Sequence, residues 1–179
     1  MNNNAPIYKD LILVGGGHTH VQVLKSWQMN PLPGVRLTLV SAAALTPYSG
    51  MLPGMIAGHY SEDDIHIDLR RVCTWAKVRF IESSVLGLNP HNKCLQLSDH
   101  PDIHYDTLSI DIGSTPDMSI PGLQEFAQAV KPIDQFYPRY LTCLEHCRTV
   151  LSLNNDQNFS ILIVGGGAGG IEVALAMAE

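Results

Sequence analysis

The sequence lacks the features that mark several large classes of protein. No apolar run reaches the roughly 18–20 residues that a membrane-spanning helix needs, and the polar N-terminal stretch MNNNAPIYKD holds no signal-peptide core. The chain carries 11 Lys and Arg against 17 Asp and Glu, a net charge of −6 without a basic stripe, which argues against nucleic acid as the main partner. We therefore expect a cytoplasmic location, and peripheral contact with a membrane stays open.

Cysteine is scarce, and its spacing argues against two common cysteine-based sites. The four cysteines include no C-x-x-C pair, so neither a zinc site nor a thioredoxin-like site is expected. Cys143 and Cys147 are four residues apart on one face of a predicted helix, where packing as small apolar side chains is favoured over a redox or metal role. Apolar residues make up 45% of the chain and charged ones 16%, which predicts a globular core.

The clearest positive signal is a turn of three glycines near the N-terminus. Residues 11–14 (LILV) form a short apolar run typical of a buried parallel strand, and a helical pattern begins at about His18. Between them lie Gly15, Gly16 and Gly17. In such a unit the first glycine permits a tight turn, and the absence of a Cβ at Gly17 lets the backbone approach a pyrophosphate that binds the free N–H groups of the helix. The pattern predicts a dinucleotide site.

One position of this motif departs from the usual pattern. Where a third glycine or an alanine normally lets helix and strand pack closely, the sequence has His20. We expect a looser or differently shaped fit, with His18 and His20 packing against a neighbouring loop or bonding to phosphate. Two histidines two residues apart at the start of a helix do not face the same way, which disfavours a metal site.

A second glycine turn repeats the motif near the C-terminus. Residues 160–172 (SILIVGGGAGGIE) again predict a strand, a turn and a helix, with the motif glycines Gly165, Gly167 and Gly170. Two such turns in one chain suggest two dinucleotides. Because residue 179 lies inside the helix that this turn begins, and a nucleotide-binding unit needs further strands and helices, we expect the chain to be an N-terminal fragment that does not oxidise NADH efficiently alone.

The rest of the chain predicts an alternation of strands and helices. The helix after the first turn should end near Asn30, ahead of two prolines. Parallel strands are expected at residues 35–40 and 77–81, and a further apolar strand at 105–112. A small antiparallel meander is expected at 85–88, 93–97 and near 104, and helices at 121–126 and 132–153. Ser61 and the three acids after it predict a helix start or a loop before one, and Arg70 and Arg71 a solvated or ion-paired face.

Residues 45–60 form an apolar stretch that is rich in turn residues. The stretch holds two prolines and three glycines, yet it carries Tyr48, Met51, Leu52, Met55 and Ile56. It could line a flat aromatic ligand, or it could be a buried turn that packs the domain. Both interpretations stay open on the sequence.

The order of these motifs resembles the two-dinucleotide flavoproteins of the pyridine nucleotide–disulfide oxidoreductase superfamily. The match consists of VGGGHTH, the meander, YDTLSIDIGSTP, a long helix and IVGGGAGGIEVA, and it covers nearly the whole chain. Within the superfamily the chain looks most like type II NADH dehydrogenases, since no cysteine lies between residues 17 and 60 to form the C-x4-C pair of the disulfide reductases. The string TPYSGMLPGMIAGHYSEDDIHIDLR is similar to the flavoprotein module that precedes a selenide, water dikinase in some bacteria.

The resemblance implies an α/β fold with two Rossmann-like units, an FAD-type unit with a β-meander and the start of an NAD(P)-type unit. It implies an FAD-binding domain in residues 1–118 (its first part), connecting helices in 119–157 and a truncated NAD(P)H-binding domain from 158. By the same likeness the FAD site would use Gly15, Gly16, Gly17, His18, Ser41, Tyr48, Val85, Asp111 and Gly113, and the NAD(P)H site Gly165, Gly167, Gly170 and Glu172.

Two residues depart from the pattern of the resembled family. Ser41 stands where an acid usually binds the ribose of the adenosine, and a serine can still bond a hydroxyl. Asp111 and Ile112 replace a small Ala-Thr pair ahead of Gly113. Asp111 is either a residue that tunes the site or a satisfied structural carboxylate, and the sequence leaves both open.

The sequence leaves two hypotheses for function. The first is an FAD-dependent NAD(P)H oxidoreductase that passes electrons to a quinone or another acceptor, with no catalytic side chain named because the flavin carries the chemistry. The second is a non-catalytic nucleotide-binding or regulatory module that is fused to, or partners, another enzyme such as the dikinase.

Overall fold

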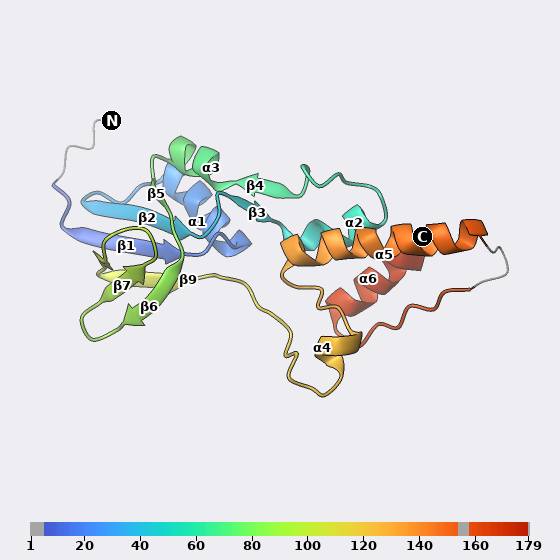
Figure 1. The fold of residues 1–179 in the computed structure, drawn as a ribbon. Helices are drawn as coiled ribbons and strands as arrows, with labels where there is room; N and C mark the ends of the chain where they lie inside the picture. Colours follow the sequence, from blue (N-terminus) through green and yellow to red (C-terminus); the bar gives the residue numbers. More distant parts are fainter. Residues whose placement is uncertain (1–5, 154–157, 179) are drawn as a thin grey trace. The chain divides into compact units, whose positions relative to one another are not determined.

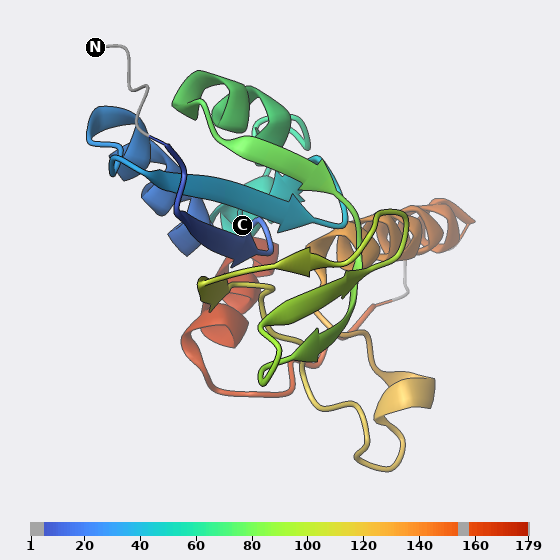
Figure 2. The ribbon, with the colours of Figure 1, turned by 90° about the vertical axis from the view of Figure 1, so that its left-hand side faces the viewer.

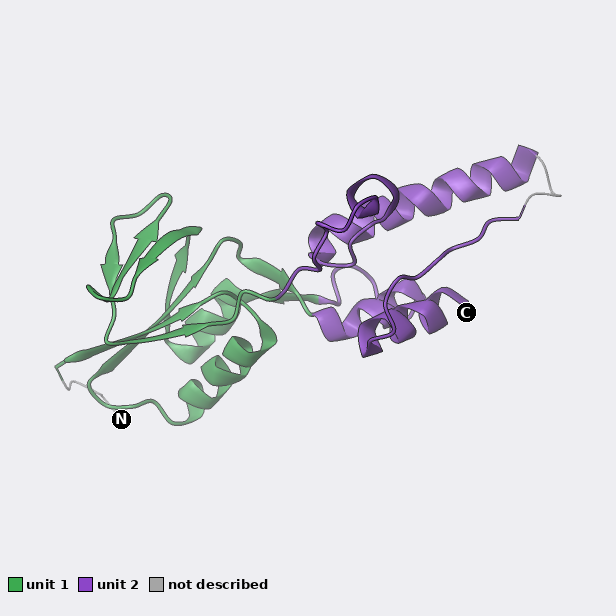
Figure 3. Ribbon diagram, turned by 90° about the horizontal axis from the view of Figure 1, so that it is seen from below, with its two compact units in different colours: residues 1–48, 66–113 green, residues 49–65, 114–179 purple. Residues whose placement is uncertain are grey.

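A computed structural model describes residues 6–153 and 158–178 of the chain. The chain divides into two compact units, one formed by residues 1–48 and 66–113 and the other by residues 49–65 and 114–179 (Figure 3). Each unit has its own hydrophobic core.

The first unit is built on a parallel sheet of four strands, in the order β5-β2-β1-β9 (Figure 1). These are β1 (Lys9–Val14), β2 (Val35–Ser41), β5 (Arg79–Glu82) and β9 (Thr107–Ile110). β1 pairs in parallel with β2 and β9, and β2 pairs in parallel with β5. The parallel strands predicted at residues 11–14, 35–40 and 77–81 are thereby confirmed, and the strand predicted at 105–112 forms as well, parallel to β1.

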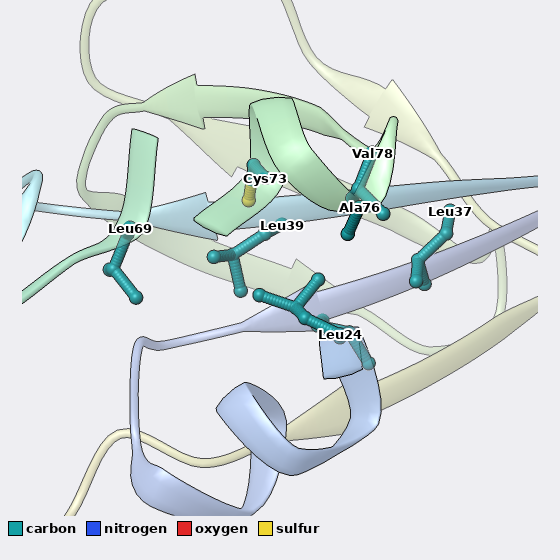
Figure 4. Packing of buried hydrophobic residues seen from close by; sticks show 8 residues of the cluster. Leu24, Leu37, Leu39, Leu69, Cys73, Ala76 and Val78 are labelled. Atoms are coloured by element: carbon teal, nitrogen blue, oxygen red, sulfur yellow. The ribbon is translucent and has the colours of Figure 1, made fainter. Parts of the chain in front are cut away.

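Helices α1 (His18–Met29) and α3 (Leu69–Ala76) cover one face of this sheet. Alternate residues of the strands point to opposite faces, so Leu13, Leu37 and Leu39 belong to one cluster with Leu24 of α1 and with residues of α3. Figure 4 shows Leu37 and Leu39 beside Leu24. α1 ends at Met29 with Asn30 as its C-cap, as the prolines predict. These contacts fix the start of α1 at the carboxyl end of β1.

The chain that leads into α3 forms a loop and a short strand. Ser61 and Asp64 hydrogen-bond to each other in a loop, so of the two predictions for residues 61–64 the loop is confirmed. β4 (His66–Asp68) then pairs antiparallel with β3 (Leu45–Pro47). The Asp68 side chain accepts a bond from the Arg71 backbone N–H (3.1 Å) and caps α3.

A small antiparallel sheet lies on the other face of the parallel sheet (Figure 2). Its strands, β6 (Val85–Asn89), β7 (Cys94–Leu97) and β8 (Ile103–His104), confirm the predicted meander. Leu95 and Leu97 of β7 pack on Ile12, Val14 and Val40. The central strands are therefore buried on both faces, as their continuous apolar runs predict.

The second unit is helical in its described part. It contains a short 3-10 helix (Ser49–Met51), α2 (Leu52–Ile56), α4 (Leu123–Phe126), α5 (Ile133–Leu153) and α6 (Ala168–Ala178). Its core consists of Leu52, Met55, Ile65, Ile133, Phe136 and Val173. The apolar side chains of Leu52 and Met55 thus form a core, which supports the packing interpretation for that part of residues 45–60.

The second glycine turn has its helix but not its predicted strand. α6 follows the turn, whereas residues 158–166 form no strand among the described residues. Ile161, Leu162 and Val164 are between 61% and 86% exposed. A parallel strand exists only when a neighbouring strand pairs with its N–H and C=O groups, and the second unit has no strand in the part that the structure describes. The predicted second strand–turn–helix unit is wrong in this respect.

In the described ranges no helix is long and apolar enough to cross a membrane.

Candidate dinucleotide-binding site

The first glycine turn is held tightly between the ends of β1, β2 and β9. The Gly15 N–H donates to the Val40 carbonyl (2.8 Å), and the Asp111 N–H donates to the Val14 carbonyl (2.8 Å). Gly15 has a φ of +94°, a conformation that favours glycine. A Cβ at this position would overlap the backbone carbonyl of Asp111. The turn therefore requires glycine at position 15 for two reasons, conformation and space.

The start of α1 is capped by a side chain from another strand. Gly17 is the N-cap residue and has no side chain with which to cap. One oxygen of Asp111, Oδ2, accepts bonds instead from the backbone N–H groups of Thr19 (3.1 Å) and His20 (3.3 Å). These are the second and third residues of the helix, whose N–H groups an N-cap side chain normally binds.

The carboxylate of Asp111 lies where a Cβ would stand if residue 17 were not glycine. A Cβ on Gly17 would overlap Cγ and both oxygens of Asp111. We expected the absence of this Cβ to admit a pyrophosphate, whereas in the structure the space is filled by the Asp111 side chain. The sequence could not predict this occupant, because the strand ending in Asp111 is more than 90 residues from the turn.

His20 forms a buried bridge between the turn and β9. The ring is 1% exposed, with Nδ1 2.8 Å from the Gly15 carbonyl and Nε2 2.9 Å from the Ser109 hydroxyl. Since a carbonyl only accepts, Nδ1 carries the donated proton. We predicted a looser or differently shaped fit at this position, and the structure shows a differently shaped one, in which two hydrogen bonds of the histidine join the turn to β9. His20 therefore bonds to the neighbouring glycine turn, as one of the two predictions for it expected.

Ser109 is a site residue that sequence reasoning missed. It lies two residues before Asp111, near the end of β9. Residues two apart in a strand face the same side, so a serine and an acid in the pattern SxD at the end of a predicted strand were the available signal.

The remaining predicted residues of the first site lie near the carboxyl ends of the strands. Ser41 ends β2, Val85 begins β6, and Gly113 follows β9 with a φ of +78°. His18 is exposed, and its ring centroid lies 6.0 Å from that of Tyr48. In open parallel sheets, ligands bind beyond the carboxyl ends of the strands. Of these residues, Ser41 and Gly113 lie at or just beyond the carboxyl ends of parallel strands.

An acid does lie beside Ser41, on the neighbouring strand. Glu82 of β5 is the register partner of Ser41, and its carboxylate binds the guanidinium of Arg70 from α3. The predicted ion-paired role is thereby confirmed for Arg70. A second ion pair, Arg36 with Asp10 (2.6 Å), raises the pKa of the Arg36 guanidinium through their hydrogen bond.

The second glycine turn is less closely surrounded by other atoms than the first. Gly165 has a φ of +118°, and a Cβ on Gly170 would lie 2.5 Å from the Gly165 carbonyl oxygen. Ideal Cβ atoms on Gly165 and Gly167 would meet no described atom within 4 Å. Glu172 is exposed on the first turn and a half of α6. The turn is compact at Gly170 and open at Gly165 and Gly167.

Comparison with known proteins gives this arrangement a family. Residues 9–179 match the family model described as pyridine nucleotide-disulphide oxidoreductase. NDH2 from Plasmodium falciparum in complex with NADH is similar over 95% of this chain and 37% of its own, with 20% identity and a TM-score of 0.71. The water-forming NADH oxidase from Lactobacillus brevis bound to NADH is similar over 96% and 37%, with 17% identity and a TM-score of 0.64.

A third solved structure agrees with these two. NADH:rubredoxin oxidoreductase from Clostridium acetobutylicum is similar over 95% of this chain and 42% of its own, with 23% identity and a TM-score of 0.61. The chain therefore spans about two fifths of the length of these structures, and at such identities the likeness establishes the fold. With the family model matching nearly the whole sequence, the chain belongs to the pyridine nucleotide-disulphide oxidoreductase family.

Proposed function

We propose that the first unit binds FAD and that the chain serves an FAD-dependent NAD(P)H oxidoreductase. Hydride would pass from NAD(P)H to the flavin, and electrons would leave to a quinone or another acceptor. The observation that carries this proposal is the glycine turn between β1 and α1, whose backbone only glycine fits at position 15. It lies at the carboxyl end of a parallel sheet, where dinucleotides bind in this class of fold.

In this proposal, several residues of the first unit would each hold one part of the FAD molecule. The backbone at Gly15, Gly16, Gly17 and His18 would face the pyrophosphate at the start of α1. Ser41, at the end of β2, would bond the adenosine ribose, and the backbone of Val85 would meet the adenine. Tyr48 and Gly113 would approach the isoalloxazine and ribityl parts. These roles are proposals that rest on the resemblance to the family, and the position of Ser41 at the end of β2 agrees with them.

NAD(P)H would bind at the second glycine turn. Gly165, Gly167 and Gly170 would hold its pyrophosphate at the start of α6, with Glu172 beside it. The open space around Gly165 and Gly167 leaves room for a close approach of phosphate to backbone.

The flavin supplies hydride acceptance and electron release when bound, so no side chain is needed as a catalytic acid or base. The protein's part is to hold the cofactor by backbone N–H groups and to set the electrostatics around it. His20 and Ser109 keep the Gly15 carbonyl turned into the protein. Since N–H and C=O of one peptide point in opposite directions, this turns the Gly16 N–H away from His20.

A second candidate function is a non-catalytic nucleotide-binding module that partners or is fused to another enzyme, such as a selenide, water dikinase. The observation in its favour is the Asp111 carboxylate at the start of α1, which places a negative charge beside the site. We place either form of the protein in the cytoplasm.

An absorption spectrum before and after anaerobic NADH tests the proposal. The longest native form of the protein is purified, and we expect visible flavin bands that bleach when NADH is added. Flavin bands that persist with both NADH and NADPH would favour the non-catalytic module. A protein that neither carries FAD nor takes it up would overturn the proposed function.

A further inference from the structure

We propose that Asp111 is a built-in anion that competes with the pyrophosphate of a dinucleotide for the start of α1. Neutralising this carboxylate should therefore tighten dinucleotide binding to the first glycine turn. The inference rests on the proposed function, because it assigns to that same site a residue that limits its affinity.

The geometry places the carboxylate where an anionic ligand of this turn is expected. Oδ2 of Asp111 already accepts the N–H groups of Thr19 and His20, and the carboxylate fills the space that the absent Cβ of Gly17 leaves. The backbone reinforces this position, since the Gly17 N–H donates to the Asp111 carbonyl (3.2 Å). The contact thus comes from both the main chain and the side chain of one residue.

The electrostatic consequence follows from the charge of each group. The start of a helix carries about half a positive charge, and α1 has no acid in its own first turn. Asp111 is therefore the acid that binds this helix end, and its negative charge offsets the positive potential at the start of α1. A pyrophosphate brought to the same turn meets this negative charge at short range, and the repulsion between the two anions opposes binding.

A purely structural cap would behave differently. Asparagine has an oxygen of the same shape and can accept the same N–H bonds without the charge. If Asp111 served only to hold α1 in place, Asp111→Asn would leave dinucleotide affinity unchanged or weaken it. If the charge competes with the ligand, affinity rises while the ligand-free protein loses some stability, because a charge-assisted bond to the helix is lost.

The experiment compares FAD and ADP binding to the wild-type chain, Asp111→Asn and Asp111→Ala. Binding is followed by flavin fluorescence for FAD and by calorimetry for ADP, which shares the pyrophosphate but has no flavin. The matched control is Asp106→Asn, because Asp106 also accepts a backbone N–H, that of Asp10 (2.7 Å), but at the opposite end of β1. Each titration is run at low and at high salt.

We expect Asp111→Asn to bind FAD and ADP about tenfold more tightly than wild type at low salt, with a smaller gain at high salt. Asp106→Asn should bind like wild type. Binding by Asp111→Asn with none by wild type would also support the inference. If wild type binds and a folded Asp111→Asn protein binds equally or more weakly, the inference is overturned while the proposed function stands. Absence of binding by every form would overturn the proposed function and the inference with it.

Discussion

At the scale of single residues, the informative positions are those where the chain departs from its family's pattern. His20 occupies a position that the pattern reserves for a small residue, and Asp111 another. In the structure both belong to one polar group at the junction of turn, helix and strand, together with Ser109. The sequence identified the two departures but not their connection, because hydrogen bonds across about 90 residues follow from topology and not from local pattern.

His20 should contribute to stability. Replacing it with alanine removes a fully buried ring and leaves the Gly15 carbonyl without its donor. We expect His20→Ala to lower the free energy of unfolding by about 2–4 kcal/mol, measured by chemical denaturation. His18→Ala is the control, because His18 is exposed on the same helix, and its effect should stay below about 0.5 kcal/mol. Equal effects of the two substitutions would contradict the buried role of His20.

Cys73 should be protected from alkylation until the chain unfolds. Burial against the sheet raises the pKa of its thiol from 9.0 to about 11, so at pH 8.5 the reactive thiolate is suppressed in the folded state. We expect iodoacetamide to modify the exposed Cys143 but not Cys73, as read by mass spectrometry, and to modify both after denaturation.

The same raised pKa has a consequence for stability at high pH. Below about pH 9 the thiol of Cys73 is protonated in both states, whereas between about 9 and 11 the unfolded chain loses this proton and the folded chain keeps it. The contribution of Cys73 to stability is therefore lost as pH rises through that window. A Cys73→Ala variant should show a smaller fall in stability over the same window, and an identical fall in both proteins would contradict this account.

At the scale of elements, the turn between β1 and α1 is the part of the site that the sequence predicts best. Its strand, its glycines and the start of its helix are all predictable, because apolar runs, glycine and helix periodicity are local signals. What covers the turn is not predictable, since Asp111 arrives from β9. The sequence predicted that small residues are needed there and could not say which atoms require them.

Two glycines with similar φ angles should respond very differently to substitution by alanine. Gly15 and Gly113 both have positive φ, +94° and +78°, so alanine is strained at each by roughly 1–2 kcal/mol. Only at Gly15 would the added Cβ overlap backbone atoms, those of Asp111, while at Gly113 it meets nothing within 4 Å. We expect Gly15→Ala to cost at least about 2 kcal/mol more than Gly113→Ala, measured by thermal unfolding. Similar costs would show that strain alone matters at position 15.

At the scale of the whole molecule, two glycine turns that look alike in sequence have different surroundings. The first follows a strand that pairs on both sides, with β2 and β9. The second follows residues 158–166, which form no strand in the described part of the chain. Local pattern predicts the preference of a segment for extended structure, but a strand forms only with a partner. The sequence therefore predicted the strand, turn and helix at the first glycine turn correctly, but at the second it predicted a strand that the described residues do not form.

This difference predicts contrasting hydrogen exchange for the two segments. Backbone N–H groups of Leu11–Val14 lie in the centre of a sheet, and those side chains are largely buried, so they should exchange only in rare opening events. Ile161, Leu162 and Val164 are mostly exposed and outside any strand, so their N–H groups should exchange orders of magnitude faster. β9, which pairs with β1 at the edge of the order β5-β2-β1-β9, serves as an internal reference of intermediate protection.

Exchange followed by NMR or by mass spectrometry of peptides makes this comparison in one sample. Protection of residues 161–164 equal to that of β1 would mean that the segment finds a strand partner in solution, for example in a second copy of the chain, and the protection should then fall on dilution. A second measurement compares hydrogen exchange before and after NADH is added. If the turn at Gly165 binds the nucleotide, protection should rise at the start of α6 and leave β1 unchanged, because ligand contacts slow local opening only where they form.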